Sequence, residues 1–475
     1  MKYLLLLPFL LLAVVLAAVL RALLTPRKKA DYSPAPDPER EWEYAGLLSR
    51  MVQCETVSHR DDPELAKFRR FHTLLEEMFP LVHARTEKVE IDGNLLFFWT
   101  GKRHDRPLVL MSHQDVVPAE GEWLHPPFSG EIADGKVWGR GASDTKCSLF
   151  AFFRAAEELL ASGFQPEQDV ILASSCTEEF GGDGAPKLVA ELRRRGIVPF
   201  LVCDEGGGII GEPVGGIPGR FAMVGVLEKG QANVRFTARS AGGHASAPTK
   251  SNPLARLSGF IQRMEKHPPF RKKLEPEVAA MFRAMAPYAS FPLRLLLGNL
   301  WLFAPLLKLA MPMVSAQAAA MLRTTMVFTM AEGAAACNVI PAAASVSANL
   351  RFIPHQGMEE SLSLVKKEAK RFGLETEILS ASDYTAPVDI RGSAWQMVAE
   401  TIAQVFPGVP VSPYVMTGGT DARFYQELCP SCVRFAPVIY DPEQMKGMHG
   451  LNENISSACL PGAVDYYKAL IRRNL

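Results

Sequence analysis

A chain of 475 residues is longer than one hydrophobic core usually supports, so we expect two domains. Apolar residues make up 48% and charged residues 21%, an ordinary globular mixture with too few cysteines, eight, for a disulfide scaffold. Lys and Arg together number 51, as do Asp and Glu, and this zero net charge argues against a nucleic-acid partner.

The N-terminal segment is almost uninterrupted apolar sequence from Tyr3 to Leu24, with Arg21 as its only charge. It has the ~20 residues that cross a bilayer, so residues 1–24 are predicted to form an uncleaved membrane helix. The prolines within residues 25–40 indicate a stiff linker to the globular part. Basic residues flank the helix, and the positive-inside rule would leave the globular part in the cytoplasm.

From Glu41 onward, short apolar runs alternate with helical patterns. Residues 107–111, 169–174 and 200–203 are apolar runs, and residues 148–161 carry a helical period. This alternation predicts an α/β fold around a mostly parallel central sheet. Ligands of such sheets collect at the carboxyl ends of the strands.

Potential metal ligands follow the predicted strands. Zinc takes nitrogen and oxygen ligands, and two metals about 3.5–4 Å apart need a shared carboxylate. A single polar residue at a strand end usually satisfies backbone groups, but several of ligand type together predict a metal site. Asp144 is suited to the shared position because it follows a glycine-bearing turn and opens a helix. The candidate ligands are His113, Asp144, Glu179, Asp204 and His449.

Two further carboxylates have expected roles beside the metals. Asp115 lies two residues beyond His113, and on an extended segment both side chains point to one face. Asp115 is therefore placed to accept the second imidazole N–H and fix the tautomer. Glu178 and Glu179 are adjacent, so on an extended segment one binds metal while the other faces the substrate as a general base.

These motifs resemble those of M20 metallopeptidases. Residues 113–118 (HQDVVP) resemble H-x-D-V-V-P, residues 139–146 (GRGASDTK) resemble G-R-G-A-x-D-x-K, and residues 177–179 and 204–206 match in type and order. The resemblance implies two Zn²⁺ ions per chain, with Co²⁺ or Mn²⁺ also possible at such ligands. It implies Glu178 as general base and the ligand pairs His113 with Asp204 and Glu179 with His449, bridged by Asp144.

The resemblance also implies an inserted α+β lid or dimerisation domain. A break near Gly225, followed by alternating apolar and polar residues over 232–238, is consistent with such an insertion. We expect the zinc-peptidase-like catalytic domain in residues 41–225 and 386–475. The lid is expected in residues 226–385, with an apolar insertion at about 275–325. Such a lid could carry the surface of a homodimer.

The lid motifs resemble family segments that surround the substrate. Residues 241–248 (AGGHASAP) resemble G-G-H-x-S-x-P, which implies that His244 helps to stabilise the tetrahedral intermediate, often across a dimer. Residues 337–341 (CNVIP) imply that Asn338 supports the oxyanion. Taken alone, His244 in a Gly-rich turn would be structural.

Two more segments are expected at the substrate carboxylate. Residues 348–351 (ANLR) resemble a strand-borne arginine of the family, which implies that Arg351 binds the carboxylate through two parallel hydrogen bonds. The Gly418–Gly419–Thr420 loop resembles the loop that lines the substrate site. Without the resemblance, Arg351 would be interpreted as a surface residue of a strand and the Gly418–Gly419–Thr420 loop as a plain turn.

A long apolar segment, residues 292–313, departs from the simplest M20 pattern. It resembles the branch that contains vacuolar carboxypeptidase S and the secreted N-fatty-acyl-amino-acid synthase/hydrolase. Two interpretations remain open: lid core or dimer interface, and an apolar pocket or membrane-facing surface for an acyl chain. A second membrane span is disfavoured because Arg294, Pro305 and Lys308 interrupt the run.

The expected function is hydrolysis of an amide beside a free amino-acid carboxylate, with N-acyl amino acids, including fatty-acyl ones, as substrates. Metal-activated water attacks, with Glu178 as base. The alternatives are a carboxypeptidase or dipeptidase acting on short peptides, and a membrane-tethered binding protein without catalysis. The family places such catalytic bodies outside the cytoplasm, against the charge pattern of the N-terminus. Cys429 and Cys432 are expected to be ordinary thiols or a local disulfide.

Overall fold

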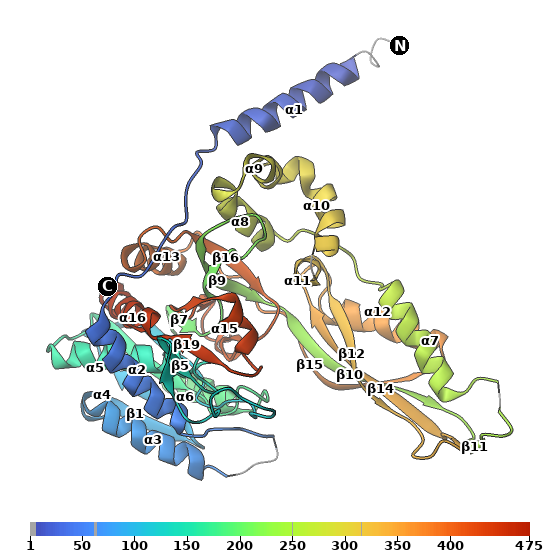
Figure 1. Cartoon of the computed structure of the whole chain (residues 1–475), viewed down its shortest axis with the longest axis horizontal. Coiled ribbons are helices and arrows are strands. Elements are labelled where there is room, and N and C mark those ends of the chain that lie inside the picture. Colours follow the sequence, from blue (N-terminus) through green and yellow to red (C-terminus); the bar gives the residue numbers. More distant parts are fainter. Residues whose placement is uncertain (1–5, 61–63, 249, 315) are drawn as a thin grey trace.

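The computed structural model describes residues 6–60, 64–248, 250–314 and 316–475, and Figure 1 shows two β-sheets flanked by helices. Residues 1–5 of the expected membrane helix lie outside this range. The described part of that segment, α1 (Leu6–Leu24), is helical. Among the described residues, none of the helices alone combines the length and apolarity that a bilayer crossing needs.

The larger sheet has ten strands and is mixed. The neighbours β6, β3, β7 and β17 run parallel, whereas β1–β2, β2–β6, β8–β9 and β9–β17 are antiparallel. Parallel pairs also occur where β9 meets β16 and where β8 meets β18 at the edge, so the sheet expected to be mostly parallel is mixed, with antiparallel pairs interspersed among the parallel ones. In spatial order the strands are β1 (Glu87–Ile91), β2 (Asn94–Trp99), β6 (Gln168–Ser174), β3 (Arg103–Met111), β7 (Leu201–Asp204), β17 (Cys432–Arg434), β9 (Arg220–Glu228), β8 (Gly208–Gly211) and β18 (Ile439–Tyr440), with β16 (Val411–Met416) also beside β9.

Helices cover both faces of this sheet. Along β3, Leu108 and Leu110 enter one apolar core and Val109 enters the other, as the alternation of side chains along a strand requires. The first core is completed by α2 (Pro38–Gln53), α3 (Ala66–Met78), α4 (Pro80–Arg85), α5 (Lys146–Ala161), α13 (Ser393–Val405) and α16 (Leu460–Arg473), which follows η2 (Ser457–Cys459). The second is completed by α6 (Gly184–Arg194) and α14 (Ala422–Tyr425).

The strand before Asp144 belongs to a separate small sheet. β5 (Lys136–Trp138) lies between β4 (Ile132–Ala133) and β19 (Asn454–Ser456), and α15 (Pro442–Gly447) precedes β19. Because β5 and β19 are antiparallel neighbours, the loop after β5 lies beside the loop before β19. The segments around Trp138 and Asn454, far apart in the sequence, thus meet.

A four-stranded antiparallel sheet forms the second body in Figure 1. The burial of side chains alternates along β10, which confirms the strand predicted over residues 232–238. Helices α7 (Pro253–Lys266) and α12 (Met358–Arg371) pack on the sheet, around Phe236 and Phe260. The strand order is β12 (Thr325–Glu332), β14 (Ala343–Phe352), β10 (Gly230–Arg239) and β15 (Glu375–Ser382), and the short pair β11 (Gly243–His244) and β13 (Val339–Ile340) lies at its far end.

The apolar segment forms helices that join the core of the larger body. They are α8 (Pro276–Met285), η1 (Ala286–Tyr288), α9 (Phe291–Gly298), α10 (Leu300–Val314) and α11 (Ala316–Ala320). Leu297, Leu307 and Met311 belong to the first core of the ten-stranded sheet and not to the core of the four-stranded sheet. The lid-core interpretation is therefore wrong. Together α9 and α10 reach the length of a membrane span, but they are bent by 108° at their junction.

The segment expected to be a linker is held against the body. The Lys28 backbone N–H donates to the Pro287 carbonyl, and the Arg220 backbone N–H donates to the Ala30 carbonyl. The ring of Tyr32 makes an edge contact with Phe406. The chain between α1 and α2 therefore fixes the direction in which α1 leaves the body (Figure 1).

Candidate functional site

Asp144 lies between two imidazoles. Its Oδ1 is 3.2 Å from Nε2 of His113 and its Oδ2 is 3.1 Å from Nε2 of His449. Hydrogen bonds to Asp144 and Glu179 raise the pKa of His449 to about 11. The two oxygens of one carboxylate thus face two different imidazoles, which is the arrangement expected of a carboxylate shared by two metals.

Glu179 completes a compact group of ligand atoms. Atoms of His113, Asp144 and Glu179 all lie within 4.8 Å of one another, and Glu179 Oε2 is 3.0 Å from Nε2 of His449. The other oxygen, Oε1, is buried and has no hydrogen-bond partner among the described residues. His449 has a φ of 56°, in the left-handed region that is unusual for a residue with a side chain. The donor types and the unpartnered oxygen fit a bound divalent cation.

A buried ion pair sets the loop that carries Asp144. Arg140 Nη1 is 2.7 Å from Glu453 Oε2, and both side chains are inaccessible to solvent. Glu453 Oε1 also accepts from the backbone N–H groups of Gly141, Ser143 and Asp144. Glu453, just before β19, therefore fixes the backbone after β5 from which Asp144 projects.

Replacing Glu453 with Ala is expected to lower the free energy of unfolding by about 3–5 kcal/mol, because it leaves Arg140 charged, buried and unpaired. Chemical denaturation of the metal-free protein measures the change. Glu443→Ala is the matched control: that carboxylate pairs with Lys136 on the surface, where an ion pair contributes about 0–1 kcal/mol. Equal losses for the two variants would contradict the role given to Glu453.

Asp115 organises the turn that carries Glu178 and Glu179. Its carboxylate accepts from Ser58 Oγ at 2.6 Å and from the backbone N–H groups of Glu178 and Glu179 at 3.3 and 3.1 Å. The extended segment expected here is a turn, closed by the Gly181 N–H donating to the Glu178 carbonyl. His113 Nδ1 lies 2.9 Å from the Asp115 carbonyl and 3.5 Å from its carboxylate, so the carbonyl is the closer acceptor.

Asp204 does not point at the group around Asp144. Its carboxylate oxygens accept from the backbone N–H groups of Glu205 and Ala422, each at 2.8 Å, so it anchors the start of α14. Glu205, one residue later, lies close enough to Asp144 and His113 for both to influence its carboxyl group. Burial, reinforced by the nearby carboxylates of Asp144 and Asp204, raises the pKa of Glu205 well above its usual value. Glu205 is therefore a second, partly buried acid near Asp144 that the sequence analysis did not single out, and adjacent residues at a strand end take opposite faces.

Glu178 lies near the same group, and within the described part of the chain its carboxylate makes no hydrogen bond to His113, Asp144 or Glu179. Burial raises the pKa of Glu178 well above its usual value, and Asp421 and Glu205 add to the rise while His113 opposes it. A raised pKa means that a carboxylate accepts a proton more readily, which suits a general base. Ser175 Oγ donates a hydrogen bond to the carboxylate of Asp421. This bond holds the loop after β16 next to the segment that follows β6, on the same side of the site as Glu178.

His244 and Asn338 lie together but apart from this group. His244 ends β11 and Asn338 directly precedes β13; both residues are exposed, and the Ala245 backbone N–H donates to the Asn338 carbonyl at 3.0 Å. Figure 1 places the β11–β13 pair at the far end of the four-stranded sheet. His244 Nδ1 is bonded to Ser246 Oγ at 2.7 Å. Within a single chain, the structure does not bring these two residues to Asp144.

The expected carboxylate-binding residues lie where the chain crosses between the sheets. Thr420 Oγ1 donates to Glu228 Oε1 at 2.7 Å at the end of β9, and Lys229 follows before β10 begins. Arg351 on β14 is half-buried and donates to Asn349, and it has no carboxylate partner among the described residues. Burial lowers the pKa of Arg351, and Arg423 adds to this effect. Glu228 opposes this lowering, although within the described chain it forms no ion pair with Arg351, so the Arg351 guanidinium is suited to bind an anionic group.

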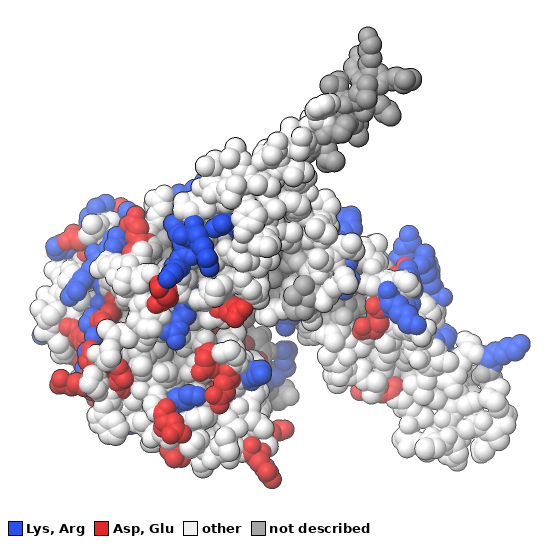
Figure 2. Space-filling model, turned by 45° about the horizontal axis from the view of Figure 1, so that its top comes forward, with Lys and Arg blue, Asp and Glu red and all other residues white. Residues whose placement is uncertain are grey.

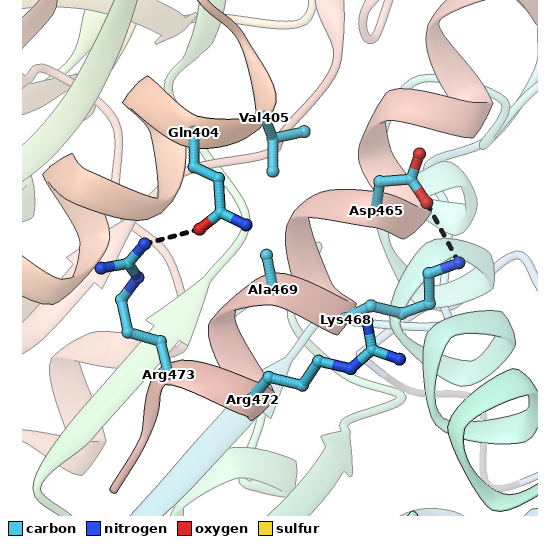
Figure 3. A pocket seen from close by; sticks show the side chains of 7 residues that line it. All are labelled: Gln404, Val405, Asp465, Lys468, Ala469, Arg472 and Arg473. Carbon is cyan, nitrogen blue, oxygen red and sulfur yellow. Dashed lines mark hydrogen bonds and ion pairs between the residues drawn. The ribbon is translucent and has the colours of Figure 1, made fainter. Parts of the chain in front are cut away.

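A surface hollow of about 620 Å³ lies elsewhere, between α13 and α16 (Figure 3). Its lining includes Lys468 and Arg472, and Lys468 is paired with Asp465 at 3.0 Å. It contains none of the residues expected in the site. Cys429 and Cys432 are buried free thiols, which confirms the ordinary-thiol interpretation.

Comparisons with known proteins agree with these observations. The profile of Peptidase family M20/M25/M40 matches residues 109–473. The chain is 31% identical to the probable carboxypeptidase S-like 2 of Dictyostelium discoideum, over 90% of this chain and 85% of that protein. It is 32% identical to the human N-fatty-acyl-amino acid synthase/hydrolase PM20D1, over 90% of this chain and 86% of that protein.

The fold is similar to that of solved metallopeptidases. An M20 family metallo-carboxypeptidase from Sulfolobus solfataricus aligns with a TM-score of 0.69 at 18% identity, covering 91% of this chain and 99% of that one. Human carnosine dipeptidase 1 aligns with a TM-score of 0.62 at 16% identity, covering 92% and 97%. The chain belongs to Peptidase family M20/M25/M40 and is a metallohydrolase of its peptidase and amidohydrolase type.

Proposed function

We propose that the chain is a two-zinc hydrolase of N-acyl amino acids. The observation that carries this proposal is Asp144, whose two carboxylate oxygens face His113 and His449 separately. We assign His113 and Glu205 to one ion and Glu179 and His449 to the other, with Asp144 shared. Imidazole nitrogens and carboxylate oxygens are ligands that zinc accepts, and cobalt or manganese fit the same donors.

Bound there, the ions supply Lewis-acid polarisation of the scissile carbonyl and lower the pKa of a water molecule at the site. Glu178 takes a proton from the attacking water and delivers it to the leaving amine. Asp115 holds the Glu178–Glu179 turn through two backbone N–H groups and thereby orients the base. The raised pKa of Glu178, caused first by burial, suits both halves of this proton transfer.

Arg351 and the Gly418–Gly419–Thr420 loop hold the free carboxylate of the amino-acid half. The support for this assignment is that Arg351 is half-buried, without a carboxylate partner among the described residues, and close enough to Arg423 for its pKa to be lowered. His244 and Asn338 are assigned to the oxyanion. They must reach it by movement of the four-stranded sheet or from a second copy of the chain, because in one chain they lie at the far end of that sheet.

The acyl half distinguishes the two candidate substrate classes. The named relatives at about equal identity include an N-fatty-acyl-amino acid synthase/hydrolase and a carboxypeptidase S-like protein. The apolar helices α9 and α10, attached to the body that carries the metal ligands, favour a fatty-acyl substrate over a short peptide. We also propose that α1 anchors the chain to a membrane.

A substrate panel tests the proposed class. Turnover of N-acyl amino acids is expected to rise with acyl-chain length and to exceed turnover of dipeptides, while methyl esters of the same substrates should be poor because Arg351 loses its anionic partner. The measurement is kcat/KM for each compound with the zinc-loaded full chain. Faster cleavage of dipeptides than of every N-acyl amino acid would favour the peptidase, and chelator-insensitive turnover would contradict a metal mechanism altogether.

A further inference from the structure

We propose that α9 and α10 form a second membrane-contact surface, which lies in the headgroup region of a bilayer beside the point where α1 enters it. We call these two helices and the bend between them the apolar elbow. This inference does not depend on the substrate of the enzyme. It concerns how the catalytic body is held against a lipid surface.

The apolar elbow exposes large hydrophobic side chains that no other described element covers. Trp301, Leu306, Leu309 and Met313 on α10 are between 51% and 84% exposed. In the view of Figure 2 the described surface over α9, α10 and the start of the linker shows few charged side chains, whereas charged side chains gather on the larger body below it; the tip of the second body is also mostly uncharged. A surface of this kind marks a protein or membrane contact, and tryptophan is typical of the membrane interface.

The apolar elbow is joined to α1 by specific packing. The side chain of Asn299, fully buried at the bend, donates from Nδ2 to the Ala18 carbonyl of α1 at 3.0 Å. Among the α1 residues whose burial the structure describes, Ala18 and Ala22 are buried, whereas Leu16, Leu20 and other large side chains remain exposed. The contact between α1 and α9 therefore makes one continuous apolar surface from segments far apart in the sequence.

The charges around this surface identify its partner. Residues 1–30 contain no Asp or Glu, and neither do residues 278–331. The charges that they carry are all basic, among them Arg27, Lys28 and Lys29 after α1 and Arg294 and Lys308 on the apolar elbow. Basic residues beside an apolar surface complement anionic lipid headgroups. A second copy of the chain would present the same positive charges and offers no such complementarity.

The chain that follows the apolar elbow is bonded to the crossing between the sheets. Lys229 Nζ donates to the carbonyls of Ala320, at the end of α11, and Arg323, at 3.0 and 2.9 Å. Lys229 follows Glu228, which accepts from Thr420 of the proposed carboxylate-binding loop.

A depth measurement on the full-length chain tests the proposal. An environment-sensitive fluorophore is attached at Leu309→Cys, with the exposed Cys337 replaced by Ser, and the protein is reconstituted into phosphatidylcholine vesicles containing phosphatidylserine. The matched control carries the same fluorophore at Val198→Cys, a similarly exposed apolar position between α6 and β7. Lipid-borne nitroxide is expected to quench the fluorophore at 309 several-fold more strongly than the one at 198.

The outcomes separate the bilayer from other partners. The expected preference at 309 should weaken when phosphatidylserine is omitted or when Lys308 is changed to Glu, but not with Lys366→Glu on α12. Equal access of an aqueous quencher to both positions would overturn the proposal. Protection of position 309 without lipid quenching would also overturn it, since it would indicate contact with a second copy. The zinc content and hydrolysis rate report separately on the proposed function.

Discussion

The Glu178→Gln variant is expected to lose amide hydrolysis by about 10²–10⁴-fold in kcat while it keeps its metal content. Glutamine preserves the shape of the side chain but cannot accept the proton of the attacking water. Glu178 is not part of the group of ligand atoms formed by His113, Asp144 and Glu179. Replacing its carboxylate with an amide therefore leaves the proposed metal ligands intact. The measurement combines steady-state kinetics with metal analysis of the same preparation.

The control for this variant is Glu122→Gln, an exposed carboxylate on the loop before β4, whose turnover should match the unmodified chain. If Glu178→Gln turned over substrate at the rate of that control, Glu178 would lose its role as base. If it instead lost its metal together with activity, Glu178 would be a ligand.

The second large effect concerns the adjacent acids Asp204 and Glu205. Glu205→Gln is expected to weaken zinc binding by more than the about 10–100-fold typical of residues that only support a ligand. Asp204→Asn should fall within that range, because an amide oxygen can still accept from the Ala422 backbone N–H. Competition with a chromophoric chelator measures both affinities.

These two variants are matched controls for each other, since they neighbour one another and remove one negative charge each. Loss of zinc from Asp204→Asn with normal binding by Glu205→Gln would restore the ligand set expected from the sequence. Equally small losses of zinc affinity in the two variants would mean that neither acid binds the metal.

Much of the site was predictable because its residues follow local rules. The apolar runs of β3, β6 and β7 are distinct, and His113, Asp144 and Glu179 lie in or beside motifs whose spacing is specific. The three side chains lie close together for two reasons. His113 and Glu179 follow the ends of the neighbouring parallel strands β3 and β6, and the pairing of β5 with β19 positions the loop that carries Asp144.

Other features depend on geometry that local sequence does not encode. Which of Asp204 and Glu205 faces the site depends on where β7 ends, and a shift of one residue reverses the answer. The Glu178–Glu179 segment is a turn because Asp115, far away in sequence, accepts from its backbone. The attachment of the apolar helices to the larger body depends on tertiary packing, which composition alone could not assign.

The pairing of β5 with β19 has a consequence for the order in which the enzyme matures. Arg140 and Glu453, which fix the loop around Asp144, are 313 positions apart, and His449 lies in the same late segment. During synthesis from the N-terminus, the ribosome must release nearly the entire chain before these partners can meet. Loading of the proposed cations would therefore be a late, post-translational event, and a nascent or C-terminally truncated polypeptide would lack His449 from its proposed ligands.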